Sequence, residues 1–292
     1  MDTSANVVIT PDFNTIPQTE IKPTTTDIFD TRVRLLHLTD LHLFADADVQ
    51  LLGQNTRLTF HSVLNWVQCH HWPVSAILLT GDLVHDENIA TYRYLGQYLK
   101  QLGCPYYCLP GNHDRVDLVA GLLDPYQPSR LHIIELEYWD LILLDSTIPS
   151  ESSGYLAPSS LAQLEAHLIH NERRPTLVAL HHHPIASGSQ WLDALMVYNG
   201  NDLLSIIDRY PQVRVVVWGH THQQFDGQCG HSMLFSTPST CVQFLPYSQN
   251  FALDTLTPGY RWIDLYSDGQ VKSGVERIPA YPDPVQLDSL GY

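Results

Sequence analysis

The chain has 292 residues, a formal net charge of −16 and 44% hydrophobic residues. This length and apolar content allow one large domain, or two small ones, with a buried core. The negative charge argues against nucleic acid or an anionic membrane surface as a partner, because clusters of Lys and Arg hold such polyanions.

The sequence predicts neither membrane insertion nor secretion. No apolar run approaches membrane-spanning length, and no basic start precedes an apolar stretch. We therefore expect a cytoplasmic protein, and its five scattered cysteines predict reduced thiols rather than a disulfide framework. Residues 1–31, rich in Thr, Pro and Asp, predict a flexible leader. We expect one domain over residues 32–280 and a C-terminal tail over residues 281–292.

Short apolar runs alternate with longer amphipathic ones from Val33 onward, which predicts a layered α/β architecture. We expect the first strands over residues 33–39, 76–80 and 106–109. One helix is expected over residues 56–70, with Asn55 as its cap. A second helix is expected to begin after Asp86, its predicted cap, and to end at Gly103 in a left-handed turn.

The second half of the domain continues this alternation. Residues 131–135 and 138–144 predict paired strands, and a capping box at Ser160 predicts a helix to about Asn171. Further strands are expected over residues 176–180, 213–218, 233–236, 260–266 and 271–278. No internal repeat or domain linker is evident.

Polar clusters follow five of the apolar runs, so each is expected at the end of a strand, where ligand sites of open α/β sheets lie. They supply Asp, Asn and His, ligands suited to borderline divalent metals. A single cluster of this kind is more often a turn or a surface loop than a metal site. Together they favour a dinuclear metallohydrolase. The clusters are Asp40-Leu41-His42, Gly81-Asp82, Gly111-Asn112-His113-Asp114, His181-His182-His183 and Gly219-His220-Thr221-His222.

Several residues can be given roles from their chemistry. The Asp82 carboxylate has two oxygens and can bridge two cations, while Asn112 is a neutral oxygen ligand that preserves their Lewis acidity. Asp114 and Asp145 are candidates to orient a ligand imidazole, although structural hydrogen bonding would explain them at least as well. Asn55 and Arg57 could reach a substrate, although helix capping explains Asn55 equally well. The histidines outside the clusters are assigned to surface or supporting positions; His37, His70, His71 and His85 are among them.

The ordered clusters resemble the signature of the calcineurin-like metallophosphoesterase superfamily, from about Val33 to Ile278. A closer similarity, to bacterial class III 3′,5′-cyclic AMP phosphodiesterases, comes from stretches outside the ligands as well. Those stretches are residues 39–44, 109–114, 180–184 and 237–244, with Asn250-Phe251, Leu253-Asp254-Thr255 and Pro258-Gly259. The resemblance implies a four-layer αββα sandwich of two mixed β-sheets flanked by helices.

The resemblance also implies a ligand set. One ion would be held by Asp40, His42, Asp82 and His222, and the other by Asp82, Asn112, His182 and His220. His182 is chosen because the family's ligand lies two residues before a proline, so His181 and His183 would point elsewhere. Iron with manganese is implied, with zinc possible. The substrate would be bound by His42, Asp82, Asn112, His113 and His222.

The implied reaction is hydrolysis of cyclic AMP to 5′-AMP, which lowers cellular cyclic AMP. A metal-bound hydroxide would attack phosphorus, and His113 would assist the departing O3′. The cyclic nucleotide is the expected partner, and the chain would be a monomer or homodimer. Two alternatives stay open. One is hydrolysis of another phosphodiester or of a phosphomonoester, on a nucleotide or a phosphoprotein; the other is a non-catalytic metal-binding scaffold.

Overall fold

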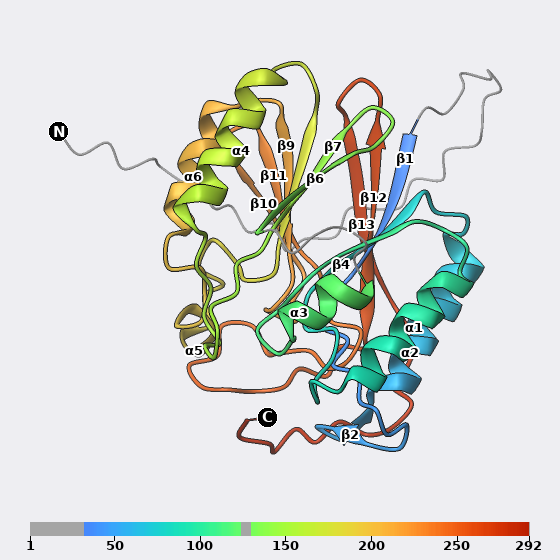
Figure 1. Cartoon of the computed structure of the whole chain (residues 1–292). Helices are drawn as coiled ribbons and strands as arrows, with labels where there is room; N and C mark the ends of the chain where they lie inside the picture. Colours follow the sequence, from blue (N-terminus) through green and yellow to red (C-terminus); the bar gives the residue numbers. More distant parts are fainter. Residues whose placement is uncertain (1–31, 124–129, 292) are drawn as a thin grey trace, which may run out of the picture.

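Two mixed β-sheets packed face to face form the centre of the fold, and helices cover their outer faces (Figure 1). The computed structural model describes residues 32–123 and 130–291, so the predicted leader over residues 1–31 lies outside it. The layers are therefore helix, sheet, sheet and helix. This confirms the four-layer αββα sandwich that the sequence resemblance implied.

The first sheet has five strands in the order β13-β12-β1-β4-β5. Its centre is parallel, since β1 pairs with β4 and β4 with β5 in the same direction, while β12 and β13 add antiparallel pairs. The strands are β1 (Arg32–Leu38), β4 (Ala76–Thr80), β5 (Tyr106–Leu109), β12 (Gly259–Tyr266) and β13 (Val271–Arg277).

The second sheet has six strands in the order β10-β11-β9-β8-β7-β6. Strands β11, β9, β8 and β7 are parallel neighbours, and the edge strands β10 and β6 are antiparallel. The strands are β6 (Leu131–Glu135), β7 (Asp140–Leu144), β8 (Thr176–Leu180), β9 (Val213–Trp218), β10 (Phe225–Cys229) and β11 (Ser232–Ser236).

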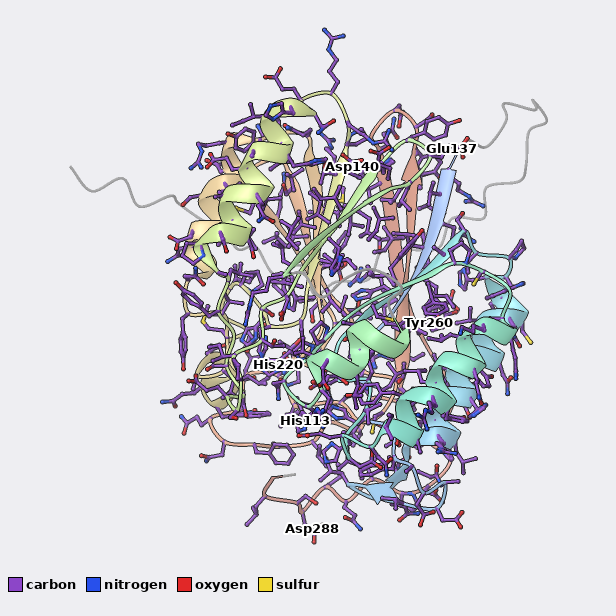
Figure 2. All side chains as sticks on the ribbon, viewed as in Figure 1. His113, Glu137, Asp140, His220, Tyr260 and Asp288 are labelled. Carbon is purple, nitrogen blue, oxygen red and sulfur yellow. The ribbon has the colours of Figure 1, made fainter. Side chains whose placement is uncertain are left out.

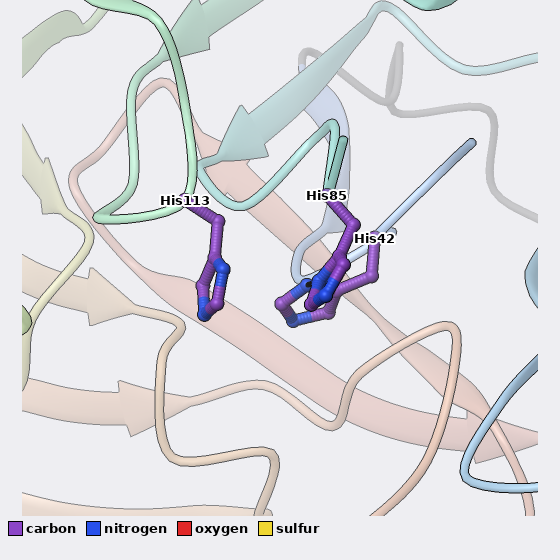
Figure 3. Close-up of side chains that lie close together, drawn as sticks. All are labelled: His42, His85 and His113. Carbon is purple, nitrogen blue, oxygen red and sulfur yellow. Dashed lines mark hydrogen bonds between the residues drawn. The ribbon is translucent and has the colours of Figure 1, made fainter. Parts of the chain in front are cut away.

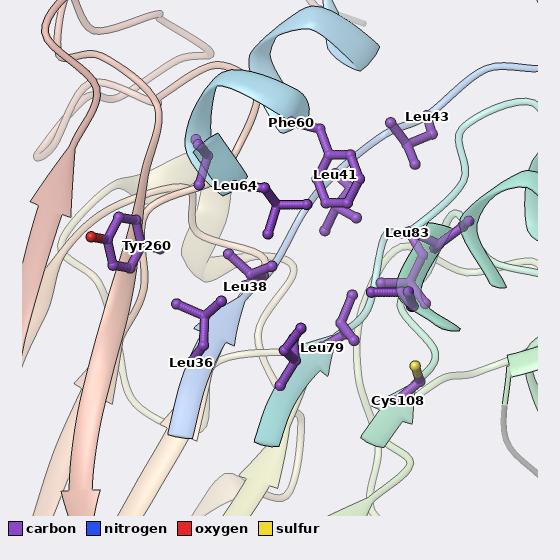
Figure 4. Packing of buried hydrophobic residues seen from close by; sticks show 14 of the residues in the cluster. Leu36, Leu38, Leu41, Leu43, Phe60, Leu64, Leu79, Leu83, Cys108 and Tyr260 are labelled. Atoms are coloured by element: carbon purple, nitrogen blue, oxygen red, sulfur yellow. The ribbon is translucent and has the colours of Figure 1, made fainter. Parts of the chain in front are cut away.

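Successive side chains of the central strands enter different cores. Leu36 and Leu38 of β1 pack beneath the helices with Phe60 (Figure 4), whereas Val33 and Leu35 face the other sheet. Because successive side chains of a strand point to opposite faces, a strand covered on both sides needs an almost continuous apolar run. This explains why these strands were recognisable in the sequence although they lack polar alternation.

Four longer helices cover the sandwich (Figure 1): α1 and α2 lie outside the first sheet, α4 and α6 outside the second. They are α1 (Thr56–His70), α2 (Ile89–Gln101), α4 (Pro158–His170) and α6 (Gly200–Arg209), and the shorter helices are α3 (Val116–Leu118), the π-helix Val119–Leu123 and α5 (Gln190–Asp193). No helix in the described ranges is long and apolar enough to cross a membrane.

The helix starts correct two sequence predictions. Asn88, rather than Asp86, caps α2 by accepting from the Ala90 N–H, while Asp86 accepts from Asn88 N and Thr91 Oγ1. Ser160 does not begin a capping box, because α4 already starts at Pro158. Proline suits a first helical position, where its missing N–H has no intrahelical partner to lose.

The last residues of the chain pack against the short hairpin of β2 (Gln50–Leu51) and β3 (Gln54–Asn55). Gln54 Nε2 donates to the Asp283 carbonyl at 2.6 Å, and the Gln286 N–H donates to the Leu52 carbonyl at 3.0 Å. Val285 contacts the apolar cluster around Leu51. Residues 283–286 of the segment predicted as a tail therefore contact the rest of the fold.

Candidate metal centre

All five polar clusters lie at the carboxyl ends of parallel strands, as predicted. The first three follow β1, β4 and β5 of one sheet, and the other two follow β8 and β9 of the opposite sheet. Figure 2 shows His113 and His220 together at this end of the sandwich, with Asp140 at the other end. Hence both sheets contribute side chains to one site.

Backbone hydrogen bonds hold the loops against one another. Asp40 N–H donates to the Gly81 carbonyl at 3.0 Å, and His42 N–H donates to the Asp82 carbonyl at 2.9 Å. Across the sheets, the His220 N–H donates to Asp40 Oδ2 at 3.0 Å. These hydrogen bonds place the loops that carry the polar side chains next to one another.

Five of the cluster residues have the left-handed backbone conformation that non-glycine residues rarely adopt. Such strain costs of the order of 1 to 3 kcal/mol per residue and persists where the surroundings enforce it, often at functional sites. The residues are Asp40 (φ 53°), His42 (φ 46°), Asp82 (φ 48°), His220 (φ 63°) and His222 (φ 48°). Because all five lie at one site, the surrounding fold must offset this strain to hold their side chains in these directions.

Glycine is required where the loops approach most closely. A Cβ atom on Gly111 would collide with Asp82 Oδ1, and one on Gly219 would collide with Thr39 Oγ1. The glycines that precede Asn112 and His220 therefore allow contact between backbone and carboxylate that any larger residue would prevent.

One group of donors converges around the end of β1. His42 Nε2 and His222 Nε2 lie 3.2 Å apart, and Asp40 Oδ1 lies 3.4 Å from His222 Nε2. All three side chains are fully buried. Their ligand atoms lie within 4.8 Å of one another, close enough for one cation to contact all three.

A second group lies on the other side of Asp82. His181 Nε2 is 3.4 Å from Asp82 Oδ2 and 3.2 Å from Asn112 Oδ1. The same Asp82 oxygen is 3.8 Å from His42 Nε2 in the first group. Asp82 is therefore placed between the two groups, which is the position a bridging carboxylate needs.

The three consecutive histidines differ from the sequence expectation. His181 does not point elsewhere: it points at Asp82 and Asn112, and its Nδ1 donates to the Thr80 carbonyl at 2.7 Å. His182 Nδ1 lies 2.8 Å from Ser146 Oγ, while its ring faces His220 with the centroids 4.7 Å apart. His183 Nε2 lies 3.6 Å from Asp193 Oδ1, and its ring stacks on that of His220 with centroids 5.6 Å apart. These contacts favour His181 over His182 for the place beside Asn112.

The charges of the site are tightly balanced. Burial alone would raise the pKa of Asp82, but the charges of His181 and His113 hold it well below its usual range. Burial alone would lower the pKa of His181, but the Asp82 carboxylate raises it to about 9. Burial lowers the pKa of His42 and His220, which favours neutral imidazoles. A cation at Asp82 would take over the role of the proton on His181, because metal binding displaces ligand protons.

The donor set suits divalent metal ions. It combines carboxylate and amide oxygens with neutral imidazoles and contains no thiolate. Within the described ranges, the buried Nε2 atom of His220 has no hydrogen-bond partner, which is costly in a site without a ligand. Two ions sharing Asp82 would explain both the convergence of the nitrogen lone pairs and the strained backbone.

His113 lies beside the first group without belonging to it (Figure 3). The backbone N–H of His113 donates to Asp82 Oδ1 at 2.9 Å, and the His113 ring centroid is 5.0 Å from that of His42. The side chain is partly exposed. It is thus near the site yet open to a substrate.

Two predicted orienting residues have different roles. Asp114 accepts hydrogen bonds from the Leu83, Val84 and Gly111 N–H groups and from Tyr92, so it organises loop backbone. Asp145 accepts from Thr147. Neither contacts a ligand imidazole in the described contacts. A backbone carbonyl, which leaves no residue-type signal in the sequence, orients His181.

Asn55 and Arg57 both hold the loop that follows β1. Asn55 caps α1 through the Leu58 N–H and donates to the Ala47 carbonyl, and Arg57 donates to the Phe44 and Ala45 carbonyls. The capping interpretation of Asn55 is therefore correct. Arg57 shapes the loop that carries Phe44.

Residues 237–244 support the first donor group directly. Ser239 Oγ donates to the Asp40 carbonyl at 2.7 Å, and His222 Nδ1 donates to the Val242 carbonyl at 2.8 Å. Phe244 stacks on His222 with centroids 4.0 Å apart and planes 8° apart. This segment, identified in the sequence by resemblance, buttresses two of the candidate ligands.

Comparison with known proteins agrees with this geometry. Residues 33–224 match the calcineurin-like phosphoesterase family. The chain belongs to that family. It is 36% identical over 263 residues to a 3′,5′-cyclic adenosine monophosphate phosphodiesterase, CpdA, of Pseudomonas aeruginosa, covering 90% of this chain and 96% of the relative.

Other relatives extend this comparison. A 3′,5′-cyclic-nucleotide phosphodiesterase of a Nostoc species is 35% identical, covering 87% of this chain and 95% of the relative. Among solved structures, a dimetal phosphatase from Danio rerio superposes with a TM-score of 0.61 at 14% identity, covering 85% of this chain and all of that one. Family membership, with the His and Asp clusters, implies a site for divalent metal ions.

Proposed function

We propose that this chain hydrolyses 3′,5′-cyclic AMP to 5′-AMP at a dinuclear metal centre. The observation that carries the proposal is the pair of donor groups that share Asp82, in a chain similar over nine-tenths of its length to a cyclic AMP phosphodiesterase. The sequence contains every metal ligand that the resemblance implies, together with His113 and the supporting residues 237–244. This argues against a scaffold that has lost its chemistry.

The ligands divide between the two ions as follows. One ion would be held by Asp40, His42, Asp82 and His222, whose side chains converge at the end of β1. The other would be held by Asp82, Asn112, His220 and one histidine of the triplet. His181 supports that last place better than His182, because its Nε2 already approaches both Asp82 and Asn112.

The reaction needs a strong nucleophile and neutralisation of phosphoryl charge. A pair of metal ions held by these residues would lower the pKa of a bound water and neutralise charge on the phosphoryl oxygens. His42, Asp82, Asn112, His113 and His222 would bind the substrate phosphate. Water adds to phosphorus as the bond from phosphorus to O3′ breaks, and His113 donates a proton to the departing O3′. The single product is 5′-AMP, whose ribose then carries a neutral 3′-hydroxyl.

Iron with manganese is the proposed metal pair, and zinc is compatible with the same ligands. The cytoplasm is the proposed compartment. Its reducing conditions match the five cysteines, all of which are free thiols in the described structure. The acidic chain has no basic track for a nucleic acid strand, so the proposed partner is the small cyclic nucleotide.

A substrate panel tests this proposal. Purified protein loaded with Mn²⁺ would be assayed on cyclic AMP, cyclic GMP, a 2′,3′-cyclic nucleotide, a generic diester and a phosphomonoester. We expect cyclic AMP turnover with 5′-AMP as the product. Turnover of the monoester without turnover of cyclic AMP would instead support the alternative phosphoesterase reaction.

A further inference from the structure

His85 lies beside the metal centre although the reaction described above gives it no task. Its Nδ1 is 3.1 Å from His42 Nδ1, and its ring stacks on His113 with centroids 4.9 Å apart and planes 21° apart. Figure 3 shows His85 close to both rings. One partly buried imidazole thus contacts a candidate ligand and the candidate acid.

The backbone fixes His85 in this place. Its N–H donates to the Leu43 carbonyl at 2.9 Å, next to a parallel bridge between Leu43 and Val84. Phe44 contacts the His85 ring at 4.9 Å between centroids, and Arg57 holds the Phe44 carbonyl. The ring is therefore supported by the strand-end loops rather than extended into solvent.

The contact with His42 constrains which nitrogen carries the proton. If His42 binds a cation through Nε2, that nitrogen must offer its lone pair, so the proton of the neutral ring resides on Nδ1. His42 Nδ1 then donates to His85 Nδ1, which accepts. An acceptor at residue 85 therefore favours the tautomer of His42 that binds metal.

The contact with His113 is of a different kind. The two rings are nearly parallel, and His113 otherwise meets His42 edge-on with an interplanar angle of 79°. A flat ring at residue 85 limits the rotation of His113 and holds it above the first donor group. The acceptor atom and the flat ring of His85 thus serve separate partners.

We infer that His85 is a positioning residue, which holds His42 in its metal-binding tautomer through Nδ1 and orients His113 through its ring. The inference rests on the proposed dinuclear centre. It assigns His85 no direct part in bond breaking. Two substitutions separate its functions: His85→Gln keeps a hydrogen-bond acceptor without a ring, and His85→Phe keeps a ring without an acceptor.

The first measurement is metal affinity, by competition of a chelator with the Mn²⁺-loaded protein. We expect His85→Phe to weaken one of two sites by about 10- to 100-fold, the usual effect of removing a partner of a ligand imidazole. His85→Gln should stay within about threefold of the original chain. Exposed His231 provides matched controls, His231→Phe and His231→Gln, with no expected change.

The second measurement is ¹⁵N NMR of the Zn²⁺-loaded protein. The protonated Nδ1 signal of His42 should persist in His85→Gln and shift in His85→Phe. The third is turnover of cyclic AMP at saturating Mn²⁺, where His85→Gln should lose more of kcat than His85→Phe because it lacks the ring.

Two outcomes would overturn the inference alone. These are unchanged metal affinity in His85→Phe, and equal weakening in both His85 variants while the original chain binds two ions. A chain that binds no Mn²⁺ would overturn the proposed function, and this inference with it.

Discussion

Acid should destabilise the folded protein through His37, a buried histidine at the junction of the two sheets. Its Nε2 and Nδ1 each lie 2.7 Å from a threonine hydroxyl, of Thr80 and Thr237 respectively. Burial, and then the charge of Arg261, lower the pKa of His37 from 6.5 to about 3. Protonating His37 would therefore cost the folded state free energy that the unfolded chain does not lose.

The sign and size of the effect follow from the two pKa values. His37 is neutral in the folded protein, so its contribution is complete above pH 6.5 and is lost as the pH falls toward 3. The loss is about 1.4 kcal/mol per pH unit below the unfolded pKa. By pH 5 it reaches about 2 kcal/mol, a substantial part of a typical domain's stability.

Urea unfolding with a metal chelator present measures this effect. His37→Gln should be less stable than the original chain at pH 8 by about 1 to 3 kcal/mol, because buried hydrogen bonds are lost. The difference should shrink by about 2 kcal/mol at pH 5, since glutamine does not titrate. The exposed His231→Gln control should show no such trend. A constant difference between His37→Gln and the original chain from pH 8 to pH 5 would show that protonation of His37 does not destabilise the fold.

Four further substitutions test the site. His181→Ala should lose one of two bound metal ions by elemental analysis, whereas His182→Ala should retain both; the reverse pattern would restore the sequence-based choice. His113→Ala should lower kcat by about 10²- to 10⁴-fold, as for a lost general acid, with both ions still bound; loss of metal would show that its assigned role is wrong. Ser239→Ala removes the hydrogen bond to the Asp40 carbonyl and should cost about 1 to 2 kcal/mol in urea unfolding, and an unchanged stability would contradict that support.

The strand ends were predictable because buried strands have a strong sequence signal. The apolar runs before Asp40, Asp82 and His220 locate β1, β4 and β9 to within about one residue of the predicted ranges. Since these strands are parallel within each sheet, their ends meet at one edge. The sequence therefore predicted which loops gather, and the structure confirms it.

Side-chain directions inside a loop were harder to predict. The choice among His181, His182 and His183 depends on where β8 ends, because a shift of one residue moves a side chain to the opposite face. β8 ends at Leu180, and His181 is the side chain that turns toward Asp82. Distance from Pro184 is no guide to that direction.

Long-range contacts explain the remaining omissions. His85 meets His42 across 43 positions through the pairing of neighbouring loops, and Val242 reaches His222 from a separate segment. Neither contact has a local pattern. The cap of α2 is Asn88, two residues after the predicted Asp86. The sequence did not distinguish them because this polar stretch offers several possible caps.

The most direct test of the central claim is a metal titration followed by product analysis. Metal-free protein would receive Mn²⁺ in steps, and formation of 5′-AMP from cyclic AMP would be measured at each step. We predict that the rate reaches its plateau at two ions per chain and that Asp82→Asn never reaches it. A full rate at one ion per chain, or no 5′-AMP at any metal content, would contradict the account.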